Sequence, residues 1–246
     1  MDRLIYTAMT GAKHILEQQA TTSHNLANVN TSGFRAQLDS FRAVPVIGDG
    51  LPTRTYVVDS TVGADFTPGA IQQTGRDLDV AVLNKGWISV ELPDGTEGYT
   101  RHGSLKVSEN GVLQTQGGLN VLGDGGAISI PPDVGITIAK DGTVSAIAVG
   151  TKPGTATPLG RIKLVNPPEE TMVRGDDGLF RTNDGKSADV DGGVVVVGGS
   201  LEGSNVNVVD AMVTMISLAR QFEMHMNMLK NAESNANKAS QLLQMG

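Results

Sequence analysis

The sequence predicts an α+β protein. Helices at the two ends of the chain form a discontinuous coiled-coil domain, and the region between them is mostly antiparallel β structure. Apolar residues near the C-terminus alternate at spacings of four and three, which is the heptad pattern of a helix that packs along another helix. The N-terminal segment repeats this rhythm over a shorter distance. Between the two ends, turn dipeptides separate short runs that are rich in valine and isoleucine.

The first predicted helix covers residues 1 to about 28. Its apolar positions keep the heptad spacing until Gln19, and these positions are Met1, Ile5, Ala8, Ala12 and Ile15. Residues 28–33 (NVNTSG) are predicted to end the helix, because Asn and Gly tolerate the left-handed conformation that closes helices.

The middle of the chain is predicted to contain two kinds of β structure. Residues 76–148 read as an antiparallel β domain of short hairpins, because Asp-Gly, Asn-Gly and Gly-Gly dipeptides punctuate the apolar runs. Residues 37–75 and 149–205 read as an extended connecting region that is rich in proline and glycine. The four valines at 194–197 are expected to be paired, since an exposed apolar edge would promote aggregation.

The second helix is predicted to start after Asn207, which resembles an N-cap with Asp210 three residues further on. Its seam would extend for roughly 50 Å at 1.5 Å per residue. The simpler alternative is a helix that packs on the core of its own domain. The seam positions are Val208, Met212, Met215, Ala219, Phe222, Met226, Leu229, Glu233, Ala236, Ser240 and Leu243. Together with residues 1–36, residues 206–246 would form a terminal assembly domain.

The net charge of −7 is unevenly distributed along the chain. Residues 1–36 carry three basic and two acidic side chains, residues 206–246 carry three of each, and the middle is strongly acidic. Nearly neutral ends can pack against other copies without strong repulsion, and an acidic middle suits a solvated surface. Because no basic patch is present, nucleic-acid binding is not expected.

The sequence contains no cysteine, so disulfides and thiolate chemistry are excluded. The first twenty residues lack the apolar core of a secretory signal, and no apolar run is long enough to span a membrane. We therefore expect a soluble protein, without membrane insertion, that is either cytoplasmic or exported without a cleaved signal peptide.

No motif in the chain has the complete pattern of a catalytic, cofactor or metal site. The Gly-Lys-Ser at 185–187 lacks the upstream glycine of a phosphate-binding loop, and the glycines at 123–126 lack the last glycine of a dinucleotide fingerprint. The acidic pairs at 77–79 and 189–191 lack the further ligands of a calcium loop. The four histidines share no metal-ligand spacing and are expected at surfaces or interfaces; they are His14, His24, His102 and His225. We expect turns at these places, no cofactor and no enzymatic activity.

Three segments resemble signatures of the bacterial flagellar rod and hook protein family. Residues 25–34 (NLANVNTSGF) resemble its N-terminal signature, and residues 201–207 (LEGSNVN) with the following helix resemble its C-terminal one. The central match consists of LDVA at 78–81, GW at 86–87 and GYTRHG at 98–103. The matches occur in the family's order and span most of the chain.

Within that family, the short length and the stretches at 41–46 (FRAVPV) and 51–55 (LPTRT) resemble the proximal rod type. The distal rod type is the nearest alternative, and a hook-type axial protein of the same family is the other. The resemblance implies a structural subunit of the flagellar basal body that is exported by the flagellar apparatus without a cleaved signal and polymerises into a helical rod across the periplasm, where it transmits torque. The implied partners are copies of itself, other proximal rod subunits, the distal rod protein and, in transit, the export apparatus.

We expect the interface between subunits to be formed by the helical seams and the end of the first helix. The expected interface residues are Ile5, Ala8, Ala12, Ile15, Leu26, Asn28, Gly33, Phe34, Val208, Met212, Met215, Ala219, Phe222, Met226, Leu229, Ala236 and Leu243. Since an isolated seam lacks a partner, the chain ends are expected to gain order on assembly. From other classes, a β-rich secreted enzyme or an adhesin remains the alternative; an enzyme of this kind would need clustered carboxylates in a cleft.

Overall fold

The computed structural model describes residues 2–45, 55–148 and 156–244, and confirms an α+β fold with antiparallel β structure between terminal helices. The chain forms two compact units. The helical unit contains Met1–Asn28, Gln37–Asp65 and Val206–Gly246; the β unit contains Val29–Ala36 and Phe66–Asn205. Residues 46–54, which carry part of the resemblance to the proximal type, lie outside the described residues.

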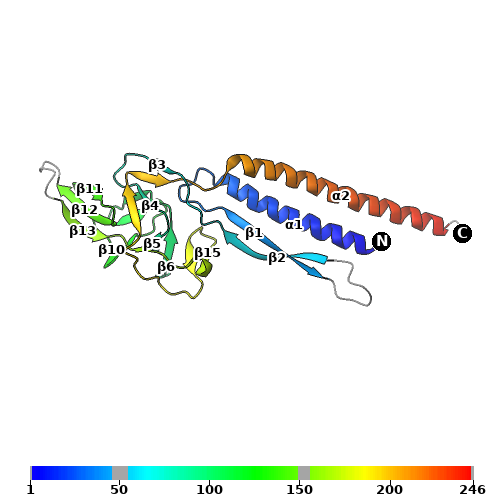
Figure 1. Ribbon diagram of the computed structural model, residues 1–246, viewed down its shortest axis with the longest axis horizontal. Helices are drawn as coiled ribbons and strands as arrows, with labels where there is room; N and C mark the ends of the chain where they lie inside the picture. Colours follow the sequence, from blue (N-terminus) through cyan, green and yellow to red (C-terminus); the bar gives the residue numbers. More distant parts are fainter. Residues whose placement is uncertain (1, 46–54, 149–155, 245–246) are drawn as a thin grey trace. The chain divides into compact units, whose positions relative to one another are not determined.

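Two long helices form the body of the helical unit. Helix α1 (Asp2–Ala27) and helix α2 (Val208–Gln244) lie side by side and run in opposite directions, so that α1 begins near the end where α2 finishes (Figure 1). The predicted N-cap is confirmed, because the Asn207 side-chain oxygen accepts from the backbone N–H of Val209 at 3.0 Å and of Asp210 at 3.4 Å. At 1.5 Å per residue, the 26 residues of α1 span about 39 Å and the 37 residues of α2 about 55 Å.

The shielded positions of the two helices follow the heptad rhythm, but the line on α2 is shifted from the predicted one. In α1 the buried or partly buried positions that keep this rhythm are Ile5, Ala8, Ala12, Ile15, Gln19, Thr22 and Leu26, and further positions of this helix are also partly buried. In α2 the positions that keep the rhythm are Ala211, Met215, Leu218, Phe222, His225, Leu229 and Ala232. The predicted and observed lines on α2 share Met215, Phe222 and Leu229. They differ by one residue at the alternate positions, so the α1-facing side is rotated away from Met212 and Ala219.

Gly11 of α1 fits against the imidazole of His225 in α2. A Cβ atom on Gly11 would lie 2.6 Å from Cε1 of His225, closer than side chains approach one another in proteins. A glycine inside a helix is unfavourable by about 1 kcal/mol relative to alanine. The close approach of the ring explains why glycine occupies this position.

We expect Gly11→Ala to weaken the pairing of α1 with α2, although alanine is the better helix former. Far-ultraviolet circular dichroism of the free chain should show a loss of helix for Gly11→Ala. The double variant Gly11→Ala/His225→Ala should restore it, because the smaller side chain leaves room for the new methyl group. If the ends of the free chain were unpaired, alanine would raise the helix content, and that result would contradict the packing.

A β-hairpin lies along α1 on another of its faces (Figure 1). It consists of β1 (Gln37–Pro45) and β2 (Thr55–Ala64), which pair in antiparallel register with a bulge at Ser40/Phe41. Asn25 holds its base: the side-chain amide donates to the carbonyl of Gln37 at 2.9 Å, and the side-chain oxygen accepts from Gln37 N–H at 2.8 Å. An isolated two-stranded hairpin has only marginal stability, so the packing on α1 stabilises this hairpin.

The β unit consists of short antiparallel strands, as predicted. A five-stranded sheet has the order β14-β5-β6-β16-β15, a three-stranded sheet has the order β11-β12-β13, and the pairs β3-β18, β4-β17, β7-β8 and β9-β10 complete the unit. The strands are β3 (Ile71–Gln73), β4 (Val80–Leu83), β5 (Trp87–Glu91), β6 (Glu97–Thr100), β7 (Leu105–Val107), β8 (Leu113–Thr115), β9 (Leu122–Gly123), β10 (Gly126–Ala127), β11 (Val134–Ile138), β12 (Thr143–Ala148), β13 (Thr157–Arg161), β14 (Leu164–Val165), β15 (Met172–Arg174), β16 (Phe180–Thr182), β17 (Val195–Gly198) and β18 (Ser200–Glu202), with a 3-10 turn, η1 (Glu169–Thr171), before β15.

Small aliphatic side chains fill the core of the β unit. Its fully buried members include Val80, Val90, Leu105, Leu113 and Ile162. Three of the four valines are paired as expected: Val195, Val196 and Val197 lie opposite Leu83, Val82 and Ala81 of β4, and Val194 is buried just before this strand. The predicted turns at 123–126 and 184–185 are present, the first as the loop between β9 and β10 and the second with Gly185 at a φ of 67°.

Candidate functional site

An apolar patch is exposed at the start of α2. It consists of Val208, Val209, Met212, Val213 and Ile216, whose exposed fractions range from 37% to 67%. This set, called here the α2 patch, lies on a different side of the helix from Ala211, Met215 and Leu218, which face α1. An exposed apolar surface of adjacent side chains indicates an interaction site. Met212 can adapt its shape to a partner because its side chain is unbranched and polarisable.

Helix α1 exposes a second apolar line. Tyr6, Met9 and Leu16 are each at least 50% exposed, and their spacings of three and seven place them along one side of the helix. Lys13, which lies between them, forms an ion pair with Glu17 at 3.5 Å. Helix α1 therefore has three sides with different roles: one packs on α2, one carries the β1–β2 hairpin, and one is free.

The predicted interface residues lie in several different environments. Ile5, Ala8, Ala12, Ile15, Leu26, Met215, Phe222 and Leu229 are buried or partly buried on α1 and α2. Val208, Met212, Ala219, Met226 and Ala236 are exposed on α2, and the side chain of Leu243 lies outside the described part. Asn28 follows the last turn of α1, where its backbone N–H donates to the carbonyl of His24 at 3.2 Å. Gly33 and Phe34 belong to the β unit.

A buried group of three charged side chains holds the two ends of the β unit together. Glu202, at the end of β18, forms ion pairs with Arg35 and Arg101, each at 2.8 Å. All three side chains are at most 3% exposed. Arg35 follows the N-terminal signature, Arg101 lies in the central motif and Glu202 lies in the C-terminal signature. The three signatures therefore meet at one place, called here the charged junction.

Backbone contacts close around the charged junction. The backbone N–H of Gly33 donates to the carbonyl of Glu202 at 2.8 Å, and Gly69 N–H donates to the Glu202 carboxylate at 2.8 Å. Gly33 has a φ of +68°, and a Cβ there would lie 2.3 Å from the carbonyl carbon of Arg101. Only glycine combines that conformation with so close an approach. The Asn205 side chain accepts from Ala36 N–H at 2.7 Å, so the segments that lead to and from the helices are tied to each other.

Aromatic rings cover the junction. The guanidinium of Arg101 lies 5.4 Å from the ring centroid of Trp87, and that of Arg174 lies 4.6 Å from the ring centroid of Phe34. Trp87 packs against Phe180 with centroids 4.7 Å apart. Cation–π contacts of this kind stabilise a buried guanidinium, which helps the β unit to retain its buried arginines.

Sequence reasoning did not predict the charged junction. A glutamate and two arginines that are separated by tens of residues resemble ordinary surface charges, and charged side chains are almost never fully buried unless they are paired. One signal was available: each charge lies inside or beside a segment that resembles a family signature. The distances between these segments along the sequence do not show that the segments meet in the folded chain.

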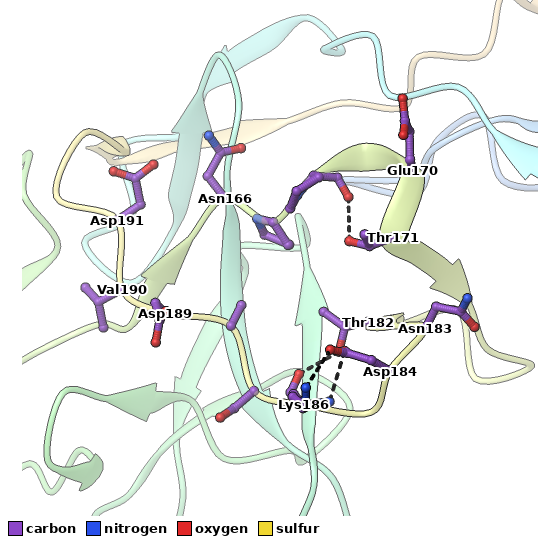
Figure 2. A pocket seen from close by; sticks show the side chains of 14 residues that line it. Asn166, Glu170, Thr171, Thr182, Asn183, Asp184, Lys186, Asp189, Val190 and Asp191 are labelled. Carbon is purple, nitrogen blue, oxygen red and sulfur yellow. Dashed lines mark hydrogen bonds and ion pairs between the residues drawn. The ribbon is translucent and has the colours of Figure 1, made fainter.

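One cavity of the β unit is acidic and open. It measures about 780 Å³ and its lining includes Glu170, Asp184, Lys186, Asp189 and Asp191. Figure 2 shows that Asp184 and Lys186 belong to a tight loop, in which Lys186 N–H donates to the Asp184 carboxylate at 3.2 Å. Among the described residues, no group of three or more His, Cys, Asp or Glu side chains is placed to hold a metal ion.

The perturbed titratable groups near the junction have packing causes. Burial raises the pKa of Tyr99, whose hydroxyl oxygen accepts from Ala188 N–H at 2.7 Å. Burial lowers the pKa of His102, which favours the neutral ring at pH 7. In the described part of the chain, neither helix is long and apolar enough to cross a membrane.

Models of three protein families match segments that contain the helices and the charged junction. "Flagella basal body rod protein" matches residues 5–35, "Flagellar hook protein FlgE/F/G D1 domain" matches 81–146 and "Flagellar basal body rod FlgEFG protein C-terminal" matches 197–242. The first and last include α1, Arg35, Glu202 and most of α2. The middle match includes Arg101 and much of the β-unit core.

Complete relatives are also similar to this chain. The flagellar basal-body rod protein FlgF of Escherichia coli K12 is 50% identical, and that of Salmonella typhimurium LT2 is 49% identical, each over the full length of both chains. The flagellar basal-body rod protein FlgG of Buchnera aphidicola subsp. Acyrthosiphon pisum is 29% identical over 89% of this chain and 92% of its own.

Proposed function

This chain belongs to the flagellar basal-body rod protein family, and we infer from that premise that it is a structural subunit of the proximal rod of the bacterial flagellum. The full-length identity of 50% to FlgF of Escherichia coli carries this proposal. The FlgG relative, at 29% identity, is more distant, which favours the proximal type over the distal rod type. No enzymatic role is proposed.

In the proposed assembly, the paired helices of each chain pack among the helices of neighbouring copies. The seam between α1 and α2 forms a coiled coil within one chain. The α2 patch and the line Tyr6, Met9 and Leu16 would then be buried against other subunits, at about 25 cal/mol per Å² of apolar surface. A head-to-tail contact that does not close generates a helical filament, and a filament of packed helices is stiff enough to transmit torque.

The partners follow from this position in the flagellum. They are copies of this chain, other proximal rod subunits, the distal rod protein and, during transit, the flagellar export apparatus. We propose that the chain is exported without a cleaved signal peptide and that the rod spans the periplasm. The three-part domain division, with 1–36 plus 206–246 as the assembly domain, remains a proposal that limited proteolysis can test.

Complementation tests the proposed function directly. Expression of this chain in an Escherichia coli strain that lacks FlgF should restore swimming, and the chain should be detected in purified basal bodies. A tagged copy that is exported but never enters basal bodies, and that leaves the cells immotile, would contradict the proposal. Native FlgF expressed from the same plasmid serves as the control.

A further inference from the structure

His14 of α1 lies between this helix and the β1–β2 hairpin, with its side chain 13% exposed. The ring packs edge-on against Phe41 of β1, with ring centroids 5.5 Å apart. Both ring nitrogens are close to oxygen atoms: Nδ1 lies 2.9 Å from a carboxylate oxygen of Glu17, and Nε2 lies 2.6 Å from the backbone carbonyl oxygen of Val57 in β2. One side chain of α1 therefore contacts both strands of the hairpin.

The two oxygen atoms around the His14 ring are both acceptors. A backbone carbonyl has no proton to donate, and neither has a carboxylate in its ionised form. A neutral imidazole has a single N–H group, so its other nitrogen would direct a lone pair at one of these oxygens. An imidazolium has an N–H group on each nitrogen and donates to both. The geometry therefore fits the doubly protonated ring of His14 and leaves the neutral ring with one repulsive contact.

The other titratable side chains around this part of α1 come from both helices and from both hairpin strands. The cations Lys13 and Arg42 are exposed, so water and salt screen their repulsion of a charged ring. Asp39 accepts a hydrogen bond from the Thr21 hydroxyl at 2.9 Å and adds negative charge to the contact between hairpin and helix. The set consists of Lys13 and Glu17 of α1, Asp39 and Arg42 of β1, Tyr56 of β2, Asp59 of β2, which lies opposite Phe41 in the strand register, and His225 of α2, which packs on Gly11 one turn before His14.

We propose that His14 is a pH-sensitive switch: its imidazolium holds the β1–β2 hairpin on α1, and loss of one ring proton weakens this packing. The hairpin forms a two-stranded sheet of its own and depends on α1 for stability. An unperturbed histidine is mostly neutral above about pH 6.5, so a hairpin that leaves α1 also releases the extra proton of His14. Because the docked state binds this proton, raising the pH disfavours docking, by up to about tenfold in the equilibrium constant for each pH unit. The hairpin covers one side of α1, and the switch controls how far that side is open to other chains.

Hydrogen exchange of the full chain, followed by mass spectrometry, tests the proposal. The measured quantity is the protection factor of the backbone amides in β1 and β2, which corrects for the faster intrinsic exchange at higher pH. Protection of the hairpin should fall at least about threefold between pH 6 and pH 8.5. Peptides from β5, in the core of the β unit, serve as the internal reference. A smaller fall would overturn the proposal, because docking of the hairpin would then be independent of the second ring proton.

The variant Glu17→Gln separates His14 from the other titrating groups. The new side-chain amide can donate an N–H to unprotonated Nδ1, or its oxygen can accept from protonated Nδ1, so either form of the ring has a partner. Protection of the hairpin in this variant should be high and nearly equal at the two pH values. The ion pair with Lys13 that is lost at the same time is exposed and contributes little.

Glu223→Gln is the matched control, because it makes the same change at an exposed position of α2. This variant should keep the pH dependence of the unchanged chain. If the two variants behave alike, or if Glu17→Gln has low protection at both pH values, the proposal fails. The measurements use the free chain, so neither result depends on the proposed role in the rod.

Discussion

Replacing Glu202 with Gln is expected to lower the free energy of unfolding of the β unit by about 3–5 kcal/mol. The substitution keeps the shape of the side chain but removes its charge. Arg35 and Arg101 then remain buried without a counter-charge, at 0% and 3% exposure. A loss of this size is a large part of the stability of an ordinary domain, so the urea concentration at which half of the β unit is unfolded should fall markedly.

Urea denaturation followed by tryptophan fluorescence measures this loss. The chain has a single tryptophan, and Trp87 is buried in the β unit beside Arg101, so the signal reports on this unit. The control is Asp177→Asn, which breaks the exposed ion pair with Arg181 at 2.6 Å and should change stability by less than about 1 kcal/mol. Similar losses in the two variants would contradict the special role of the junction.

A triple variant distinguishes charge from packing. In Arg35→Met/Arg101→Met/Glu202→Leu, apolar side chains replace the whole group, and such replacements of buried ion groups are often neutral or stabilising. We expect this variant to recover most of the stability lost in Glu202→Gln. If the triple variant is as unstable as the single one, two hydrogen bonds contribute more than the ion pairs do: the one that Gly69 N–H donates to the Glu202 carboxylate, and the one that the Arg35 guanidinium donates to the Thr67 carbonyl.

The elements that were predictable from sequence are those whose signals are local. The start of α2 follows from Asn207, because an N-cap needs only the residues beside it. The end of α1 follows from the Asn-rich segment and Gly33, whose positive φ matches the expectation. The hairpins of the β unit follow from turn dipeptides, which set chain direction over a few residues.

The shift of the helical seam has a different cause. The sequence of α2 contains two apolar lines, which share Met215, Phe222 and Leu229. Both lines have the spacing of a helix-packing seam, so periodicity alone does not distinguish them. The observed line includes His225, which reads as polar in a pattern but packs on Gly11 of α1. The sequence pattern of α2 alone therefore does not show which of the two lines faces α1, because that depends on the shape of α1. The positions that belong only to the other line, which include Val208 and Met212, are exposed.

The largest functional effect is expected from a charge in the α2 patch. Ile216→Asp should prevent incorporation of the chain into the rod and abolish swimming, while the free chain keeps its stability. Ile216 is 57% exposed, so the folded monomer tolerates the change. In an assembled rod the same side chain would be buried, and the loss of apolar contact together with the burial of an unpaired carboxylate would weaken joining by roughly 3 kcal/mol or more, which is over a hundredfold.

Ser217→Asp provides the matched comparison. It introduces the same charge one residue further along α2, at an exposed position about 100° around the helix from Ile216. Swimming and the amount of chain in purified basal bodies should be close to normal for Ser217→Asp and absent for Ile216→Asp, with equal urea midpoints for the two free chains. Normal basal bodies from Ile216→Asp would show that the α2 patch stays in contact with solvent after assembly. The interface would then have to lie on the side of α1 that exposes Tyr6, Met9 and Leu16, where Met9→Asp is the next variant to measure.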